Sequence, residues 1–138
     1  MQRNSLILAL LLSLSLAGCA TSGSFTAANL TNVELAEANY EIVATNVQGQ
    51  SSAEYILGIS FGAYQQQQTL ALARVSGTGK LYGEALENLW NSFREQYGET
   101  EGRNLALVNV HYDTDAVNLI LYTKPTVSIY ADVVEFTD

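Results

Sequence analysis

The sequence predicts an α+β protein, a mainly antiparallel sheet with one principal amphipathic helix packed on it, preceded by a signal peptide. Three patterns lead to this fold class. A leucine-rich run fills the first 18 residues, apolar residues recur at helical spacing over about 80–97, and β-branched segments flank that helix. We therefore divide the 138 residues into a signal peptide (1–18), a flexible tether (19–29) and one α+β domain (30–138).

Residues 1–18 have the features of a bacterial secretory signal. Arg3 gives a basic start, and the apolar core of about 13 residues suits a signal and is too short for a membrane-spanning helix. The run ends in Leu16-Ala17-Gly18-Cys19, which resembles the bacterial lipobox, where the thiol receives a diacylglycerol and the preceding peptide bond is cut. We expect Cys19 to be lipidated. The alternative is an ordinary signal peptide with a chance cysteine near its end.

Cysteine count and charge limit the partners. Cys19 is the only cysteine, which excludes an intramolecular disulfide. Cleavage before it leaves 120 residues and removes Arg3, so the net charge changes from −8 to about −9. This acidity disfavours nucleic acid and anionic lipid headgroups, so the membrane is expected as a partner through the lipid on Cys19 alone. Ala20, in place of Asp, favours the outer membrane of the cell envelope, facing the periplasm.

The first half of the domain is predicted to be mostly β. Residues 20–28 are small and uncharged and are typical of a flexible tether. Tyr40 to Val47 is rich in β-branched and aromatic residues, which predicts a strand. Ala53 to Ile59 predicts a second strand, with the start of a helix as the alternative. Leu70 to Val75 is predicted to form a short helix.

The clearest element is a helix from about Lys80 to Tyr97, ended by Gly98. Gly77-Thr78-Gly79-Lys80 before it lacks the spacing of a phosphate-binding loop, and we interpret it as a loop leading into the helix. Apolar side chains at intervals of three and four would form one buried face. They are Tyr82, Leu86, Leu89, Phe93 and Tyr97.

The last third is predicted to be β. Residues 105–112 form a strand, residues 113–115 a turn, and residues 117–122 a strand or an extended arm. Pro125 is expected at an edge or a turn because it lacks a backbone donor. Residues 126–136 form a final long strand. Its alternation places four side chains on one face: Val127, Ile129, Ala131 and Val133.

Three segments arranged around the helix support a family resemblance: Gly49 to Ile59, Gly102 to Val108 and Ala131 to Phe136. Over roughly residues 38–136 the chain resembles the small bacterial lipoproteins called TRL-like and, more distantly, the YbjQ-like domains. The resemblance implies a βαββ-type fold and, for the YbjQ-like relatives, a ring-shaped homo-oligomer. Those relatives are described as heavy-metal binders, but this chain has no Cys pair or His cluster. Neither family supplies a catalytic motif.

His111, Asp113 and Asp115 form the best candidate constellation. His111 is the only histidine, and alternate residues of a strand share a face, so its ring and two carboxylates could converge on a metal. The alternative is a polar strand end with a turn. Three such ligands would bind a divalent ion weakly, and we assign no metal, cofactor or catalytic residue.

A serine hydrolase would require Ser51 or Ser52 to share a cleft with His111, and no nucleophile-elbow motif is present. We therefore expect no enzymatic activity.

Tyrosines on neighbouring predicted strands suggest a surface for self-association. Tyr112, Tyr122 and Tyr130 would form an exposed aromatic band, and ordinary cross-strand packing is the alternative. The weakly charged segment 117–122 is a second interface candidate. The function we expect is a membrane-anchored envelope lipoprotein, a non-enzymatic binding or assembly module that forms a homo-oligomer. The alternative is a weak metal or small-ligand binding protein that uses His111, Asp113 and Asp115.

Overall fold

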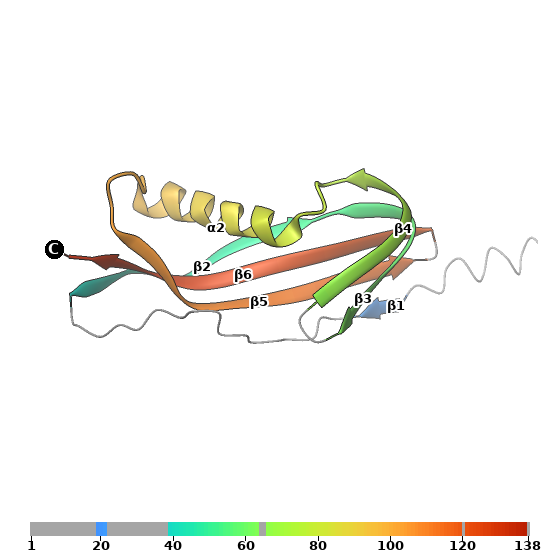
Figure 1. Cartoon of the computed structure of the whole chain (residues 1–138), viewed down its shortest axis with the longest axis horizontal. Coiled ribbons are helices and arrows are strands. Elements are labelled where there is room, and N and C mark those ends of the chain that lie inside the picture. Colours follow the sequence, from blue (N-terminus) through green and yellow to red (C-terminus); the bar gives the residue numbers. More distant parts are fainter. Residues whose placement is uncertain (1–18, 22–38, 64–65, 120, 138) are drawn as a thin grey trace, which may run out of the picture.

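The computed structural model describes residues 19–21, 39–63, 66–119 and 121–137. Six antiparallel strands form one sheet, and one helix lies across one of its faces (Figure 1). This architecture confirms the predicted α+β class. The predicted signal peptide lies outside the described residues. The elements are β1 (Cys19–Thr21), β2 (Tyr40–Ser52), β3 (Glu54–Ala63), β4 (Gln66–Ser76), α2 (Leu81–Tyr97), β5 (Leu105–Leu119) and β6 (Tyr122–Phe136).

Strand β6 is the centre of the sheet. The strand order is β1-β5-β6-β3-β4, and β2 also pairs with β6. One side of β6 is taken along its length by β5. The other side is shared, because β2 pairs with residues 126–136 and β3 takes over at Thr123 and Tyr122. The β3–β4 hairpin therefore extends from one end of the sheet (Figure 1).

Pro125 lies inside this central strand, not at the edge or turn that the sequence predicts. It faces Ala116 of β5 and sits where the other partner of β6 changes from β2 to β3. Its carbonyl oxygen accepts a hydrogen bond from the Ala53 amide at 3.2 Å. The break between the two partners accommodates a residue without a backbone donor, which an unbroken ladder would not.

Helix α2 covers the sheet with the centre of the predicted apolar stripe, Leu86, Leu89 and Phe93. The prediction was wrong for the two ends of the stripe, because Tyr82 and Tyr97 are 45% and 44% exposed. Ala85, Leu89 and Phe93 are fully buried. A Cβ atom on Gly49 of β2 would lie 2.0 Å from the Ala85 carbonyl oxygen, so only glycine permits so close an approach of helix and strand. The alternation predicted for the last strand is confirmed, because Val127, Ile129, Ala131 and Val133 are all buried in this core. The other strands contribute Ala44, Val47 and Val110.

Two local predictions were wrong. Residues 70–75 do not form a short helix but belong to strand β4, which pairs with β3. Six residues are too few to distinguish the helical period of 3.6 residues from the strand period of two. The predicted turn at 113–115 is continuous strand, since these residues face 126–128 of β6 in unbroken register. Residues 117–119 consequently end β5, and Tyr122 begins β6.

The start of the predicted tether pairs with the sheet. Cys19, Ala20 and Thr21 form β1, opposite Asn118, Val117 and Ala116 of β5. Residues 22–38, which hold the rest of the predicted tether and the predicted start of the domain, lie outside the described residues. No helix in the described part of the chain has the length and apolar character needed to cross a bilayer.

Candidate functional site

The structure places the three candidate ligands on one strand. His111, Asp113 and Asp115 follow one another at alternate positions of β5, opposite Tyr130 and the residues before it. The intervening Tyr112 packs against the core beneath α2, so the three side chains point to the helix-free face of the sheet. Alternate residues of a strand lie roughly 7 Å apart, which spreads their side chains along the surface.

These polar groups have partners within the chain. The His111 ring stacks on Tyr130, with centroids 5.1 Å apart and planes inclined by 12°. Its Nδ1 lies 3.0 Å from the Asn109 carbonyl oxygen, and the Asp113 carboxylate accepts the Thr114 amide at 2.8 Å. Within the described ranges, no group of three His, Cys, Asp or Glu residues could hold a metal ion. The geometry therefore gives no support to the alternative of metal binding.

Sequence reasoning missed a carboxylate that joins three strands on this face. Asn46 of β2 and Asn109 of β5 have positive φ values of 54° and 52°, each at a shift in strand register. Asp132 of β6, between them, accepts the Asn46 amide at 2.8 Å and the Asn109 side-chain amide at 2.8 Å. Asparagine tolerates this left-handed conformation better than other non-glycine residues, so asparagine within a strand pattern was the available signal.

Further bonds extend this polar surface across strands. Gln48 donates its side-chain amide to the Tyr130 hydroxyl at 3.2 Å, and Gln50 donates to the Ser128 hydroxyl at 3.1 Å. The helix-free face thus carries amides, hydroxyls and carboxylates that are ordered by one another. Ser128 is buried, whereas Gln48 and Gln50 are exposed. Chemically, such a surface suits hydrogen bonding to a polar partner.

The structure separates His111 from both serines of the hypothetical hydrolase. Ser52 faces Thr126, four positions along β6 from Tyr130, which is the residue that faces His111. Ser51 is buried on the helix side and donates its hydroxyl hydrogen to Glu84 of α2 at 2.6 Å. This bond is the main reason that the pKa of Glu84 lies below its ordinary value, and a hydrogen bond from Thr78 is the second reason. His111 lies on the opposite face of the sheet. The arrangement that a serine nucleophile and its base require is therefore absent for Ser51 and His111.

The predicted tyrosine band is not formed. Tyr112 lies on the helix side, where its ring meets Tyr82 edge-on at 6.4 Å. Tyr130 points to the helix-free face with His111. Tyr122 is the first residue of β6. Its pKa is raised, mainly by burial and secondly by its hydrogen bond to Glu54. Residues that face each other across two strands lie on the same side of the sheet. The prediction was wrong because Tyr130 faces His111 while Tyr112 faces Ile129, which puts the two tyrosines on opposite sides.

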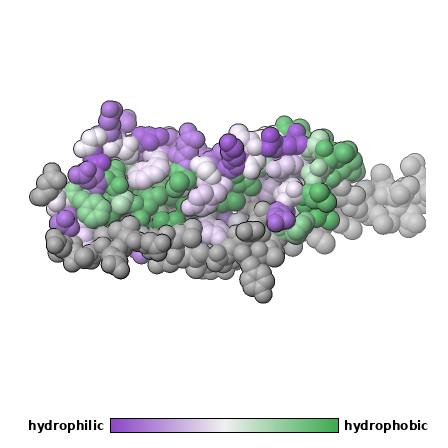
Figure 2. All heavy atoms as spheres, viewed as in Figure 1, coloured by the Kyte–Doolittle hydropathy of each residue, from purple (hydrophilic) through white to green (hydrophobic). Residues whose placement is uncertain are grey.

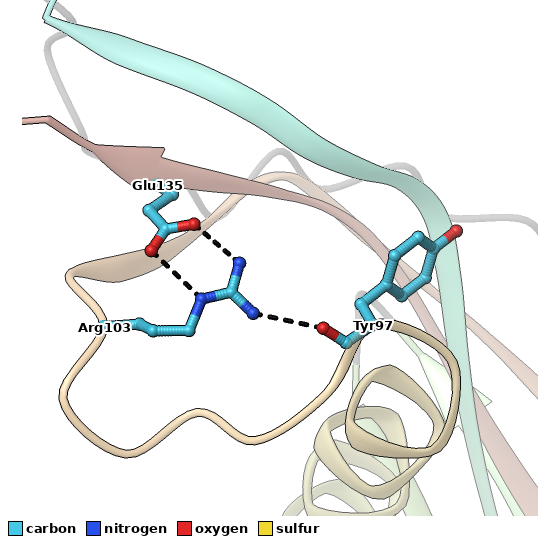
Figure 3. A network of polar contacts seen from close by, with 3 residues as sticks. All are labelled: Tyr97, Arg103 and Glu135. Carbon is cyan, nitrogen blue, oxygen red and sulfur yellow. Dashed lines mark hydrogen bonds and ion pairs between the residues drawn. The ribbon is translucent and has the colours of Figure 1, made fainter.

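An arginine fastens the loop after α2 to the sheet (Figure 3). Arg103 donates to both carboxylate oxygens of Glu135, at 3.0 and 2.6 Å, and to the Tyr97 carbonyl oxygen at 3.3 Å. Its guanidinium also lies 5.5 Å from the centre of the Phe93 ring. These bonds lower the pKa of Glu135. A shallow groove of about 520 Å³ beside it is lined by Trp90, but Arg103 is already committed to structural bonds.

The predicted lipidation residue lies at the hairpin end of the sheet. Cys19 faces Asn118 in the β1–β5 pairing. The Asn118 side chain accepts the Ser60 amide at 2.8 Å and donates to the Ser60 carbonyl at 2.9 Å, which ties β5 to β3. Figure 1 shows β1 along β5, at the end of the sheet from which the β3–β4 hairpin extends. The backbone of Cys19 is therefore held next to that hairpin.

Comparison with known proteins adds a family but no activity. No curated protein and no solved structure is significantly similar to the chain. The relation to TRL-like and YbjQ-like lipoproteins therefore stays a prediction. A family model described as a family of unknown function matches residues 1–138, and the chain accordingly belongs to that family, DUF6567.

Proposed function

We propose that this protein is an envelope lipoprotein in which a lipid on Cys19 fixes a non-enzymatic binding or assembly module to a membrane. The observation that carries the proposal is the position of the only cysteine, directly after Leu16-Ala17-Gly18 and a leucine-rich leader. The small residues at 17 and 18 suit a narrow protease site, and the thiol supplies the nucleophile for the lipid. The place of Cys19 at one end of the sheet, away from the core, supports this role.

The polar residues of the helix-free face favour binding over catalysis. Tyr130, Asp132, Gln48 and Asn109 engage one another or backbone groups across strands. A surface that is ordered in this way can present fixed donors and acceptors to a partner with little loss of side-chain freedom.

Self-association through a sheet edge is part of the proposal. In the described sheet, β2 pairs with β6 and β4 pairs with β3, so each has an edge to which a further strand could add. Sedimentation in detergent at tens of micromolar should give a dimer or a larger assembly. A single monomeric species at that concentration would remove self-association from the proposal.

The anchor is tested by mass spectrometry of the full chain produced in an enteric bacterium. We expect an N-terminal Cys19 that carries a diacylglyceryl group, in the outer membrane fraction. Cys19→Ala should abolish lipid attachment. Ala20→Asp is the matched control, because it should keep the lipid and shift the protein to the inner membrane. An unmodified sulfur or an intact leader on the wild-type chain would refute the proposal.

A further inference from the structure

The β3–β4 hairpin and the neighbouring end of β5 carry an exposed apolar surface, which we call the apolar end. Leu70 and Leu72 of β4 are 75% and 78% exposed, and Ile59 of β3 is 59% exposed. An apolar set of this size that is contiguous on a soluble domain marks an interaction site. The apolar end consists of Leu57, Ile59, Phe61, Leu70, Leu72, Leu119 and Leu121.

Charge is absent from the sequence around this surface. No Asp, Glu, Lys or Arg occurs from Tyr55 to Ala73 or from Val117 to Thr123, although the chain has 6 basic and 14 acidic residues. In Figure 2 hydrophobic colour covers the end of the molecule where the hairpin lies and also an area beneath the helix toward the other end, whereas hydrophilic colour covers much of the helix itself. The chain therefore concentrates its charge away from the apolar end.

The backbone is shaped to present these side chains. Leu57, Ile59, Leu70, Leu72 and Leu119 line a shallow groove of about 690 Å³. Leu57 has a φ of 50°, a left-handed conformation that glycine or asparagine adopts more easily. A leucine at such a position places an apolar side chain on the surface at a cost to the backbone.

The predicted anchor lies beside this groove. Asn118, which also lines the groove, is the register partner of Cys19. Acyl chains on Cys19 would therefore enter a bilayer next to the apolar end, and a tethered surface meets that bilayer at a high effective concentration. The bilayer is preferred to a second copy as the occupant, because the self-association proposed above adds a strand through the backbone edge of β2 or β4 and does not use these side chains.

We infer that the apolar end rests in the interfacial layer of a zwitterionic phospholipid bilayer, so that the lipid anchor and the hairpin hold the domain in one orientation. This inference rests on the proposed lipid anchor. Leucine and phenylalanine side chains suit this layer, and the absence of basic residues makes uncharged headgroups the matching surface.

The test uses the sole cysteine. Once its sulfur is acylated, a newly introduced cysteine is the one free thiol for an environment-sensitive fluorophore. We would label Leu72→Cys, with Leu70→Cys as a second reporter and Glu95→Cys on the exposed side of α2 as the control. Each full-length lipidated protein is reconstituted in phosphatidylcholine vesicles that contain nitroxide-labelled lipid.

We expect the probes at 72 and 70 to shift to shorter wavelength and to be quenched several-fold by the nitroxide lipid, while the probe at 95 behaves as in water. Water-like emission at 72 and 70, with lipid on Cys19 verified by intact mass, would overturn this inference and leave the proposed anchor standing. A missing lipid would overturn both. A blue shift in detergent that grows with protein concentration would assign the surface to a second copy and overturn the bilayer contact.

Discussion

A glycine sets the closest approach between helix and sheet. A Cβ at Gly49 would lie 2.0 Å from the Ala85 carbonyl oxygen and 2.2 Å from the Leu89 nitrogen, both backbone atoms that cannot swing aside. Gly49→Ala is therefore expected to lower the free energy of unfolding in urea by about 3 kcal/mol.

The matched control is Gly83→Ala in α2, where an added Cβ would meet nothing within 4 Å. It should raise the free energy of unfolding by about 0.5 kcal/mol, because alanine loses less backbone freedom in a helix. Two variants of equal stability would show that helix and strand are not as close as described.

The Arg103–Glu135 pair predicts part of the acid response. Arg103 lowers the pKa of Glu135 below its ordinary value of 4.5, so the pair stabilises the fold fully above that pH. The contribution is lost as the pH falls through the lower folded-state pKa. We expect Glu135→Gln to melt at a lower temperature than the wild type at pH 7, with the difference shrinking towards pH 3.

Thermal unfolding followed by circular dichroism between pH 3 and 7 would measure this difference. Glu101→Gln, in the loop that carries Arg103, removes the same charge without touching the pair and should keep the wild-type pH dependence. A melting difference for Glu135→Gln that is constant with pH would argue that the pair does not form in solution.

At the scale of elements, the β3–β4 hairpin is joined to the described sheet through β3 alone, which is also bonded at Leu57 to the Leu121 carbonyl and at the Gly58 carbonyl to the Thr123 hydroxyl. β3 pairs with β6 at Tyr55 and Ile56, and Asn118 supplies two further bonds to Ser60. Asn118→Asp replaces the side-chain N–H group that donates to the Ser60 carbonyl with an oxygen, so this hydrogen bond is lost and two oxygens face each other. We expect amide hydrogen exchange in β3 and β4 to accelerate roughly tenfold, while exchange in α2 is unchanged.

Asn88→Asp provides the comparison. Asn88 of α2 donates the same kind of side-chain bond to the Gln50 carbonyl, at 2.8 Å, but this bond joins α2 to β2 and involves no residue of the hairpin. Its loss should leave exchange in β3 and β4 at the wild-type rate. Faster hairpin exchange in both variants would mean that the effect is global.

Elements with a long internal pattern could be predicted from sequence, and short ones could not. The 17-residue helix repeats its period several times, and the prediction agrees with its end at Tyr97. Residues 70–75 were misassigned because partner strand β3 decides their state. The same holds for 113–115, where turn-forming aspartates were overridden by pairing with β6.

The candidate site was less predictable because it depends on contacts between distant residues. Asp132 and its partner Asn46 are 86 positions apart, and Arg103 is 32 positions from Glu135. No local pattern contains such pairs. The alternation predicted for 127–133 correctly placed its four apolar side chains on one face, but it said nothing of which residues Tyr130 and Asp132, between them, would meet.

At the scale of the whole molecule, net charge makes a prediction about lipid composition. Without residues 1–18 the chain has a net charge of about −9, and the apolar end carries no charge to attract headgroups. Replacing part of the phosphatidylcholine with anionic phosphatidylglycerol should reduce quenching of the probe at position 72, and added salt should restore it. Stronger quenching on anionic vesicles would point to electrostatic attraction instead.

The position of β6 has a consequence for how the chain folds. Every strand that pairs with β6 precedes it, so the ladder has no centre until residues 122–136 have been made. The first 121 of the 138 residues lack the strand with which β2, β3 and β5 pair, and most contacts must form over long sequence distances. The sheet should therefore fold late and in one cooperative step. Until then the growing chain stays unfolded, which is the state that a narrow translocation channel can accept.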